Sequence, residues 1–242
     1  MAQLFISDLH LSPDRPEILR LFLDFLLGPA RQAEAVYILG DLFEYWAGDD
    51  DLSAPFNRRV TKALAECSAG GTSLHLMRGN RDFLVGDDFS RAANLVLLED
   101  PGRVELADGA VMLSHGDAFC TDDAAYQAFR ATVRSADWRA AFLARPLDER
   151  KREIETLRAR SETEKRVKSA AIMDISEAAV ADFFRRHDCV RLIHGHTHRP
   201  ARHGHIVDGR SCERWVLADW YDRGSYLLSD PDGIRAVHWS GP

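Results

Sequence analysis

The chain has 242 residues, of which 45% are hydrophobic and 29% are charged, and its formal net charge at pH 7 is -7. This length suits one well-buried domain and is too short to require two independent cores. The negative balance does not favour non-specific attraction to nucleic acid, so we expect no nucleic-acid partner. Four widely spaced cysteines and a start without a secretory leader favour a reducing cytoplasm. No apolar run reaches the roughly 20 residues that cross a bilayer, so any membrane contact would be peripheral.

The first 77 residues alternate short strand-like runs with amphipathic helical runs. We expect strands at residues 4–7, 36–39 and 73–77, and helices at residues 16–27 and 55–65. This alternation predicts a parallel sheet with helical crossovers. A second set of strands is expected at residues 95–98, 103–106 and 110–114. Asp108-Gly109 between the last two strands is a hairpin turn signal.

Residues 122–168 form a strongly charged segment with a helical pattern that Pro146 interrupts. We expect two or more helices there, inserted into the core fold as a cap. From residue 130 to residue 168 the segment carries 12 Lys or Arg against 7 Asp or Glu, so the cap is basic on an acidic body. The remaining expected elements are a helix at residues 174–187 and strands at residues 190–193, 215–218, 225–228 and 234–239. The sequence therefore predicts one α/β (α+β) domain over residues 1–242, with a helical cap at about 122–168.

Five polar clusters directly follow expected strands, and together they predict one metal site. The clusters are Asp8-Leu9-His10, Gly40-Asp41, Gly79-Asn80-Arg81-Asp82, His115-Gly116-Asp117 and Gly195-His196-Thr197-His198. The carboxyl ends of strands meet at one edge of a layered fold, so loops distant in sequence can converge there. Carboxylate, imidazole and carboxamide ligands without a thiolate suit Mn²⁺, Fe²⁺ or Zn²⁺, of which we favour Mn²⁺.

Each cluster taken singly has a simpler interpretation, because a lone His or Asp at a strand end is more often a turn or capping residue. Side chains two residues apart on an extended segment point to the same side, so both members of Asp-x-His or His-x-His can reach one metal. The five clusters in this order favour metal ligands. We expect structural or surface roles for five further histidines that lack such partners, namely His75, His187, His203, His205 and His238.

The five clusters, in this order, resemble those of the calcineurin-like metallophosphoesterase family. The resemblance covers nearly the whole chain outside the helical segment, and it implies a β-sandwich flanked by helices with a two-metal centre at one edge. The implied ligands are Asp8, His10 and His198 for one metal, Asn80, His115 and His196 for the other, and Asp41 as the bridge. Such a pair lowers the pKa of a bridging water, which attacks phosphorus in line without a covalent enzyme intermediate.

Two neighbours of these ligands bear on the chemistry. Asp117 is expected either to orient His115 or a backbone group, or to serve in a local turn. Most of the family has Gly-Asn-His where this chain has Gly79-Asn80-Arg81. An arginine cannot act as a general acid near neutral pH, but it can bind a phosphate bidentately. Because a phosphate leaving group departs without a proton, Arg81 favours a pyrophosphate substrate, unless it merely pairs with Asp82 or another nearby acid.

Longer segments at residues 6–12, 40–50, 79–83 and 193–200 resemble the branch of the family that hydrolyses UDP-2,3-diacylglucosamine in the lipid A pathway of Gram-negative bacteria. This resemblance implies a metal-dependent phosphoric anhydride hydrolase that forms UMP and 2,3-diacylglucosamine 1-phosphate, with water attacking the α-phosphorus. The implied catalytic residues are Asp41, Asn80, Arg81, His115 and His196. The implied substrate contacts are Asn80, Arg81, Asp123, Ser161, Lys165, Lys168 and His196. The family often has Asn near position 165, and Asp123, Ser161 and Lys168 each have a capping or surface explanation.

The apolar residues of the helical segment have two interpretations. These residues are Tyr126, Phe129, Val133, Trp138, Phe142 and Leu143. With the resemblance, they line a groove for acyl chains while basic residues meet phosphates or anionic headgroups, which implies peripheral contact with the cytoplasmic face of the inner membrane. Alternatively, they attach the cap to the body, and the charges form a solvated helix face. No obligate protein partner is indicated.

Two other functions stay open at this point. One is a pyrophosphatase or phosphodiesterase on the same scaffold that acts on a soluble nucleotide, nucleotide sugar or diester. The other is a non-catalytic protein-binding module, which is disfavoured because all seven ligand positions carry coordinating side chains. A continuous apolar groove near the metals would favour the lipid-linked substrate over a soluble one.

Overall fold

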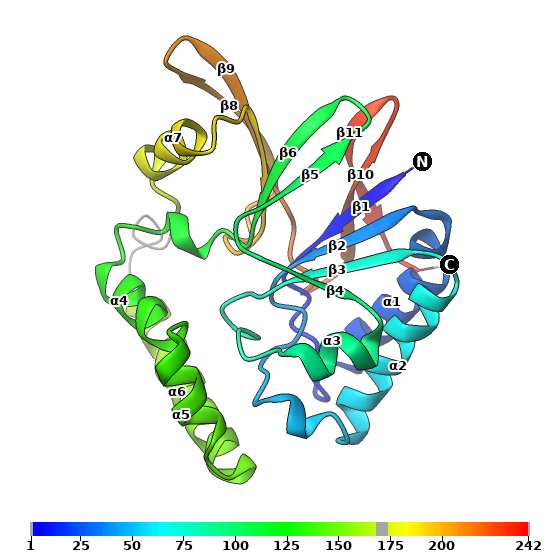
Figure 1. Cartoon of the computed structure of the whole chain (residues 1–242), viewed down its shortest axis with the longest axis vertical. Coiled ribbons are helices and arrows are strands. Elements are labelled where there is room, and N and C mark those ends of the chain that lie inside the picture. Colours follow the sequence, from blue (N-terminus) through cyan, green and yellow to red (C-terminus); the bar gives the residue numbers. More distant parts are fainter. Residues whose placement is uncertain (1, 168–173, 242) are drawn as a thin grey trace.

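The computed structural model describes residues 2–167 and 174–241, and the side chains of residues 2–159 and 174–241. Two β-sheets pack face to face, and helices cover both outer faces (Figure 1). Phe5, Tyr37 and Leu39 of the first sheet meet Leu113 and Ile193 of the second in the core between them. The predicted β-sandwich flanked by helices is therefore confirmed.

The first sheet follows the predicted alternation of strands and helices, and its strand order is β11-β10-β1-β2-β3-β4. Its four mutually parallel strands are β1 (Gln3–Ile6), β2 (Ala35–Leu39), β3 (Ser73–Met77) and β4 (Val96–Leu98). Strand β10 (Gly224–Asp230) pairs antiparallel with β1 on one side and with β11 (Gly233–Trp239) on the other. The crossover helices are α1 (Pro16–Leu27), α2 (Pro55–Ala69) and α3 (Asp87–Ala93). Ile18, Phe22 and Phe25 recur every three or four residues, so one face of α1 is buried against this sheet.

The second sheet has the strand order β5-β6-β7-β9-β8. Its strands are β5 (Gly102–Leu106), β6 (Gly109–Ser114), β7 (Arg191–His194), β8 (Ala201–Val207) and β9 (Arg210–Val216). The hairpin predicted at Asp108-Gly109 joins β5 to β6, whereas β6, β7 and β9 run parallel. Helix α7 (Glu177–Arg186) packs Val180, Phe183 and Phe184 on the outer face of this sheet.

Sequence periodicity missed or misplaced four elements. The strand expected at residues 95–98 with the second set is instead β4 of the first sheet, where it pairs with β3. Strand β8 lies at the sheet edge and exposes most of its residues, so it lacks the apolar alternation that marks a strand. The strand expected at residues 215–218 instead covers Arg210–Val216, because the buried face of β9 includes the charged Arg214. Helix α3 has only seven residues, which is too short to show a helical period.

Helices occupy the segment where the cap was expected. They are α4 (Ala124–Val133), α5 (Ala136–Leu143) and α6 (Leu147–Val167), which lie side by side at one end of the molecule (Figure 1). Phe142 is buried in the core of the first sheet, and Trp138 packs against that core and against Phe83. Phe129 and Leu143 are instead 42% and 36% exposed. The apolar residues are therefore divided between attachment to the body and exposure to solvent.

Arg150 also fixes α6 to the body, because its buried guanidinium donates to the carbonyl of Ala47 and pairs with Asp50. Short 3₁₀ turns occur at Pro29–Gln32, Asp49–Asp51 and Asp117–Phe119. Within the described residues, no helix combines the length and the apolar character that a membrane span requires.

Candidate metal centre

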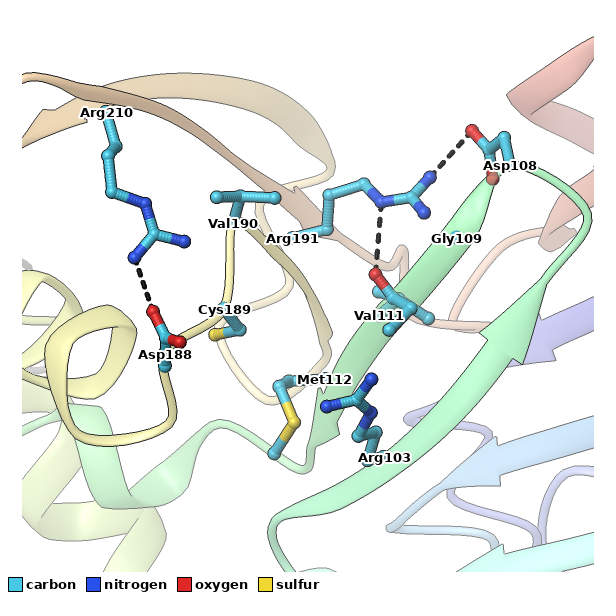
Figure 2. A pocket seen from close by; sticks show the side chains of 11 residues that line it. Arg103, Asp108, Gly109, Val111, Met112, Asp188, Cys189, Val190, Arg191 and Arg210 are labelled. Atoms are coloured by element: carbon cyan, nitrogen blue, oxygen red, sulfur yellow. Dashed lines mark hydrogen bonds and ion pairs between the residues drawn. The ribbon is translucent and has the colours of Figure 1, made fainter.

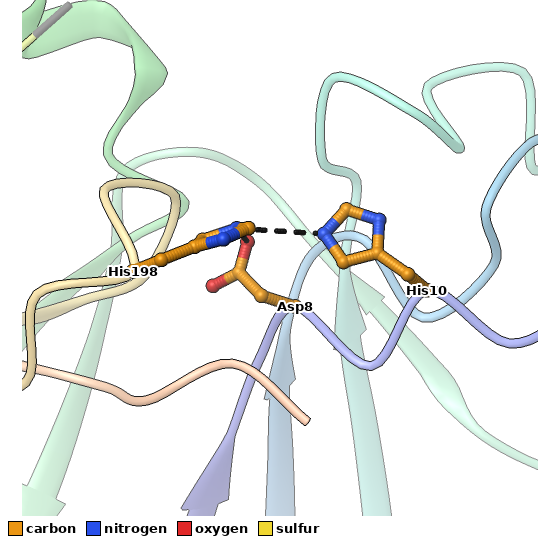
Figure 3. Close-up of side chains that lie close together, drawn as sticks. All are labelled: Asp8, His10 and His198. Atoms are coloured by element: carbon orange, nitrogen blue, oxygen red, sulfur yellow. Dashed lines mark hydrogen bonds and ion pairs between the residues drawn. The ribbon is translucent and has the colours of Figure 1, made fainter. Parts of the chain in front are cut away.

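The seven predicted ligands all lie in the loops that follow β1, β2, β3, β6 and β7. The structure brings three of them together in a first cluster, which Figure 3 shows. His10 Nε2 lies 3.5 Å from His198 Nε2, and His198 Nε2 lies 3.4 Å from Asp8 Oδ1. These facing nitrogen and oxygen atoms form a site with the donor types of a divalent metal.

A second cluster joins the loops after β3, β6 and β7. Asn80 Oδ1 lies 2.9 Å from His115 Nε2 and 2.8 Å from His196 Nδ1. One carboxamide oxygen and two imidazole nitrogens thus converge on one point. His196 faces this point with Nδ1, whereas His115 faces it with Nε2.

Asp41 lies between the two clusters and turns one oxygen towards each. Its Oδ2 is 3.8 Å from His10 Nε2 in the first cluster, and its Oδ1 is 3.8 Å from His115 Nε2 in the second. Ligand atoms of Asp8, Asp41 and His115 also lie within 4.8 Å of one another. Asp41 thus presents one carboxylate oxygen to each of the two clusters.

Two oxygens of Asp8 test whether the residues fit a metal. Oδ2 accepts hydrogen bonds from Ser7 Oγ at 2.6 Å and from the backbone N–H of His196 at 2.8 Å. Oδ1 is buried, and no donor in the described part of the chain hydrogen-bonds to it in good geometry. A buried carboxylate oxygen without a donor is costly unless a cation binds it. The donor set therefore fits a metal at Oδ1.

Five of the seven predicted ligands have a positive φ, which residues other than glycine rarely adopt. They are Asp8 (56°), His10 (49°), Asp41 (54°), His196 (69°) and His198 (55°). A residue held in this region costs about 1–3 kcal/mol, and such residues concentrate at functional sites. The loops after β1, β2 and β7 therefore hold strain where they present ligands.

Two glycines allow the loops to approach one another. A Cβ on Gly79 would collide with Asp41 Oδ1 and would lie 2.9 Å from its carboxyl carbon. A Cβ on Gly195 would collide with Ser7 and with Asp8 Oδ2. The glycines of the Gly-Asn and Gly-His pairs are therefore required by close packing against ligands.

Three histidines of the centre direct their other ring nitrogen to an oxygen. His198 Nδ1 lies 2.9 Å from Asp219 Oδ2, and His115 Nδ1 lies 2.9 Å from the carbonyl oxygen of Leu39. His10 Nδ1 lies 3.1 Å from Glu44 Oε2. Such partners fix the ring and leave Nε2 available to a metal.

The sequence analysis missed both carboxylates in this set. Glu44 has a signal, because it stands three residues after Asp41 in the same loop. Asp219 is an isolated acid after β9, and nothing in the sequence pattern singles it out.

The charges of the centre shift the pKa values of its members. Burial favours the neutral form of Asp8, but the close approach of His198 and the charges of His115, His198 and His10 lower the pKa of Asp8 below its usual range. Burial opposes the charged form of His198, but Asp219 and Asp8 outweigh it and raise the pKa of His198 to about 9. For His196, burial and the neighbouring His115 lower the pKa to about 4. His196 is therefore neutral at pH 7, with a lone pair that can bind a metal.

Asp82 organises the loops and does not pair with the Arg81 guanidinium in the described contacts. It is fully buried and accepts hydrogen bonds from the backbone N–H groups of Gly79 and Leu42, both at 2.8 Å. Arg81 Nη1 lies instead 3.8 Å from Glu44 Oε1, and the Arg81 side chain is 10% exposed. Asp82 thereby ties the loop after β2 to the loop after β3.

Asp117 binds α4. This contact was not among the roles expected for it, which were orienting His115 or a backbone group, or serving in a local turn. Its buried Oδ2 accepts from Tyr126 Oη at 2.9 Å, from Arg130 Nε at 2.9 Å and from Arg134 Nη2 at 3.0 Å. Arg134 also donates to the carbonyl oxygen of Gly79 at 3.1 Å. Asp117 therefore attaches the cap segment to the loop that carries His115, while it also opens the 3₁₀ turn at Asp117–Phe119.

The predicted substrate contacts fall into three groups. Asn80 and His196 are in the second cluster, and Arg81 follows directly. Asp123 is the N-cap of α4 and accepts from the N–H of Tyr126 at 3.1 Å. Lys168 lies outside the described residues, and so do the side chains of Ser161 and Lys165, whose backbones belong to α6.

Other histidines and the pocket in Figure 2 lie apart from the centre. His75 stacks on Tyr37 with 4.7 Å between ring centroids, and His205 Nδ1 lies 3.1 Å from Glu177. The pocket lies beside β6 and β7, and its arginines are paired, with Arg191 2.6 Å from Asp108 and Arg210 2.5 Å from Asp188 (Figure 2). It is therefore no candidate phosphate site.

Comparison with known proteins defines the class first. Residues 1–200 match the model of the calcineurin-like phosphoesterase family, so the chain belongs to that family. Proteins named UDP-2,3-diacylglucosamine hydrolase are similar over almost the full length. The relative from Aromatoleum aromaticum is 56% identical over 96% of this chain and 95% of its own. Those from Chromobacterium violaceum and Escherichia coli O81 are 48% and 45% identical, over 98% and 99% of both chains. Within the calcineurin-like phosphoesterases, the chain thus belongs with the UDP-2,3-diacylglucosamine hydrolases.

Proposed function

We infer that the chain hydrolyses the pyrophosphate bond of UDP-2,3-diacylglucosamine to UMP and 2,3-diacylglucosamine 1-phosphate, a step of lipid A synthesis. One observation carries this inference: two ligand clusters share Asp41 in a chain that is 56% identical to a relative named for this substrate. The shared carboxylate supports a two-metal hydrolase, and the relative supports the substrate.

We propose that two Mn²⁺ ions occupy the centre. Asp8, His10 and His198 would hold one ion, Asn80, His115 and His196 would hold the other, and Asp41 would contact both. Oxygen and imidazole ligands suit Mn²⁺, although the same set also accepts Fe²⁺ or Zn²⁺. When bound, such a pair supplies a hydroxide at neutral pH and neutralises charge on the phosphoryl oxygens.

The chain's own residues would bind and orient the substrate around that chemistry. Asn80 Oδ1 and His196 Nδ1 lie 2.8 Å apart in the second cluster, and Arg81 is the next residue after Asn80. The guanidinium of Arg81 stays charged, so it would hold a phosphate without transferring a proton. The departing sugar phosphate needs no general acid, which is consistent with arginine at this position.

We propose that the cap segment contacts the acyl chains of a lipid-linked substrate. Phe129 on α4 and Leu143 on α5 expose large apolar side chains, which would meet the acyl chains. The excess of basic residues in the segment favours peripheral contact with the cytoplasmic face of the inner membrane. Pelleting of the protein with anionic vesicles but not with neutral ones would support this contact, and no pelleting with either would reject it.

Hydrolysis of UDP-2,3-diacylglucosamine in H₂¹⁸O by the Mn²⁺-loaded chain tests the reaction. We expect ¹⁸O in UMP, unlabelled 2,3-diacylglucosamine 1-phosphate, and loss of turnover in Asp41→Ala. Label in the sugar phosphate would reject attack at the α-phosphorus. Cleavage of soluble nucleotide diphosphates or diesters alone would keep the two-metal hydrolase and reject the lipid substrate.

A further inference from the structure

Glu44 lies in the loop after β2, and its two carboxylate oxygens face different parts of the molecule. Oε2 lies 3.1 Å from Nδ1 of His10, whose Nε2 faces the first cluster. Oε1 lies 2.7 Å from Nη2 and 3.2 Å from Nε of Arg158 on α6. The Glu44 side chain is 16% exposed, so water competes little for these contacts.

Two arginines from different elements share Oε1 of Glu44. Arg158 comes from α6 and also lies over the ring of Tyr45, 5.5 Å from its centroid. Arg81 comes from the loop after β3, and its Nη1 lies 3.8 Å from the same oxygen. The Glu44 carboxylate therefore faces one imidazole ring and two guanidinium groups.

We propose that Glu44 is a positioning residue that couples helix α6 to the first metal site, because it orients His10 while it binds Arg158 and Arg81. The proposal rests on the proposed two-metal hydrolase. A carboxylate oxygen 3.1 Å from Nδ1 of His10 restrains the ring and directs the Nε2 lone pair to the metal. Arg158 and Arg81 in turn fix that carboxylate. Metal binding and the docking of α6 should therefore favour one another reciprocally.

Asp219 offers an internal comparison for this coupling. It faces His198 as Glu44 faces His10, at 2.9 Å. In the described part of the chain, however, no hydrogen bond or ion pair joins Asp219 to α6. Loss of either carboxylate should weaken metal binding, but only the effect of Glu44 should depend on Arg158.

Equilibrium dialysis of the full-length chain against Mn²⁺ tests the proposal without any substrate. We expect Glu44→Gln to weaken the first site roughly 10- to 100-fold. Arg158→Gln should weaken it at least about twofold, and the double variant should bind no more weakly than Glu44→Gln, because Arg158 acts through Glu44. When Arg158→Gln is added to Asp219→Asn, by contrast, it should weaken Mn²⁺ binding as much as it does in the wild type.

Lys151→Gln is the matched control on the same helix. Lys151 Nζ lies 2.7 Å from Asp51 Oδ1, and Asp51 is outside both ligand clusters, so this variant removes an ion pair of α6 without touching Glu44. We expect its Mn²⁺ affinity to stay within about twofold of the wild type. Hydrogen exchange adds a second readout: Mn²⁺ should slow exchange in α6 of the wild type and not in Glu44→Gln.

Several outcomes would overturn the proposal. Wild-type Mn²⁺ affinity in Glu44→Gln would reject the positioning of His10. Equal effects of Arg158→Gln and Lys151→Gln, or full additivity with Glu44→Gln, would reject coupling through Glu44. If Glu44→Gln does not fold, Glu44→Asp replaces it, because it keeps the charge but has a shorter side chain. Mn²⁺ binding by Glu44→Asp that is as tight as in the wild type would also contradict the proposal. Turnover of UDP-2,3-diacylglucosamine by the wild type tests the proposed function independently of this coupling.

Discussion

At the scale of single residues, the centre depends on backbone conformations that side chains rarely accept. His10 and Asp41 have φ values of 49° and 54°, and Gly79 lies so close to Asp41 that no side chain fits there. Such positions persist because hydrogen bonds over-determine them, as the backbone N–H groups bound by Asp82 illustrate. The chain therefore uses stability gained elsewhere in the fold to hold ligands in place.

Gly79→Ala should reduce kcat/KM for UDP-2,3-diacylglucosamine by at least about 100-fold, because the added methyl group displaces the carboxylate of Asp41. Steady-state kinetics and Mn²⁺ stoichiometry measure the effect. Gly204→Ala is the matched control, since a Cβ there meets nothing within 4 Å and the φ of Gly204 is not positive. Equal activity of the two variants would show that Asp41 tolerates the displacement.

At the scale of secondary-structure elements, the sequence predicted the loops of the centre better than the strands around them. Each ligand cluster follows a strand with strong apolar character, so its place at a strand end could be inferred. Strand β8 was missed because its residues are exposed, and β9 was misplaced because Arg214 is buried among partners distant in sequence. Arg214 binds His194 at 3.1 Å, a contact that appears only after the strands have paired.

The distant partners of Glu44, Asp82, Asp117 and Asp219 escaped the sequence analysis for the same reason. Glu44 contacts Arg158, 114 residues further along the chain, and Asp82 accepts from the backbone N–H of Leu42, 40 residues before it. Residue type and spacing reveal a ligand that follows a strand. They do not reveal a carboxylate whose partner comes from another part of the fold.

Phe129→Ser should raise KM for UDP-2,3-diacylglucosamine by about tenfold, because an apolar side chain that is 42% exposed on α4 would lose burial against an acyl chain. The Tm and the Mn²⁺ stoichiometry should stay unchanged. Ile206→Ser on the edge strand β8 removes a side chain that is 76% exposed and serves as the control. An unchanged KM in Phe129→Ser would place the acyl chains elsewhere.

At the scale of the whole molecule, the centre joins both sheets. Asp8, Asp41 and Asn80 follow strands of the first sheet, whereas His115, His196 and His198 follow strands of the second. Each cluster combines ligands from both sheets, so a bound ion would bridge the sandwich. The apolar core and a metal bound at the edge of the sheets would therefore both stabilise the interface between the two sheets.

Removal of divalent metal with EDTA should abolish turnover and lower the Tm, because an ion that binds only the folded chain stabilises it by about 4 kcal/mol at 1,000 times its Kd. Differential scanning calorimetry measures the shift, and added Mn²⁺ should restore both properties. Asp41→Ala is the comparison, since its Tm should respond much less to EDTA. An EDTA effect of the same size in both proteins would contradict a metal bridge through Asp41.

The distance along the chain between the ligands sets an order of events during synthesis. Asp8 Oδ2 accepts from the N–H of His196, 188 residues later, and β1 pairs with β10 near the end of the chain. A growing polypeptide therefore carries most of the ligands before either half of the centre is complete. A bound ion would cross-link a loop of nearly 190 residues. The pairing of the sheets already closes this loop, so metal binding would not carry that entropy cost again. We therefore expect metal to bind late, after the two sheets have formed and packed together.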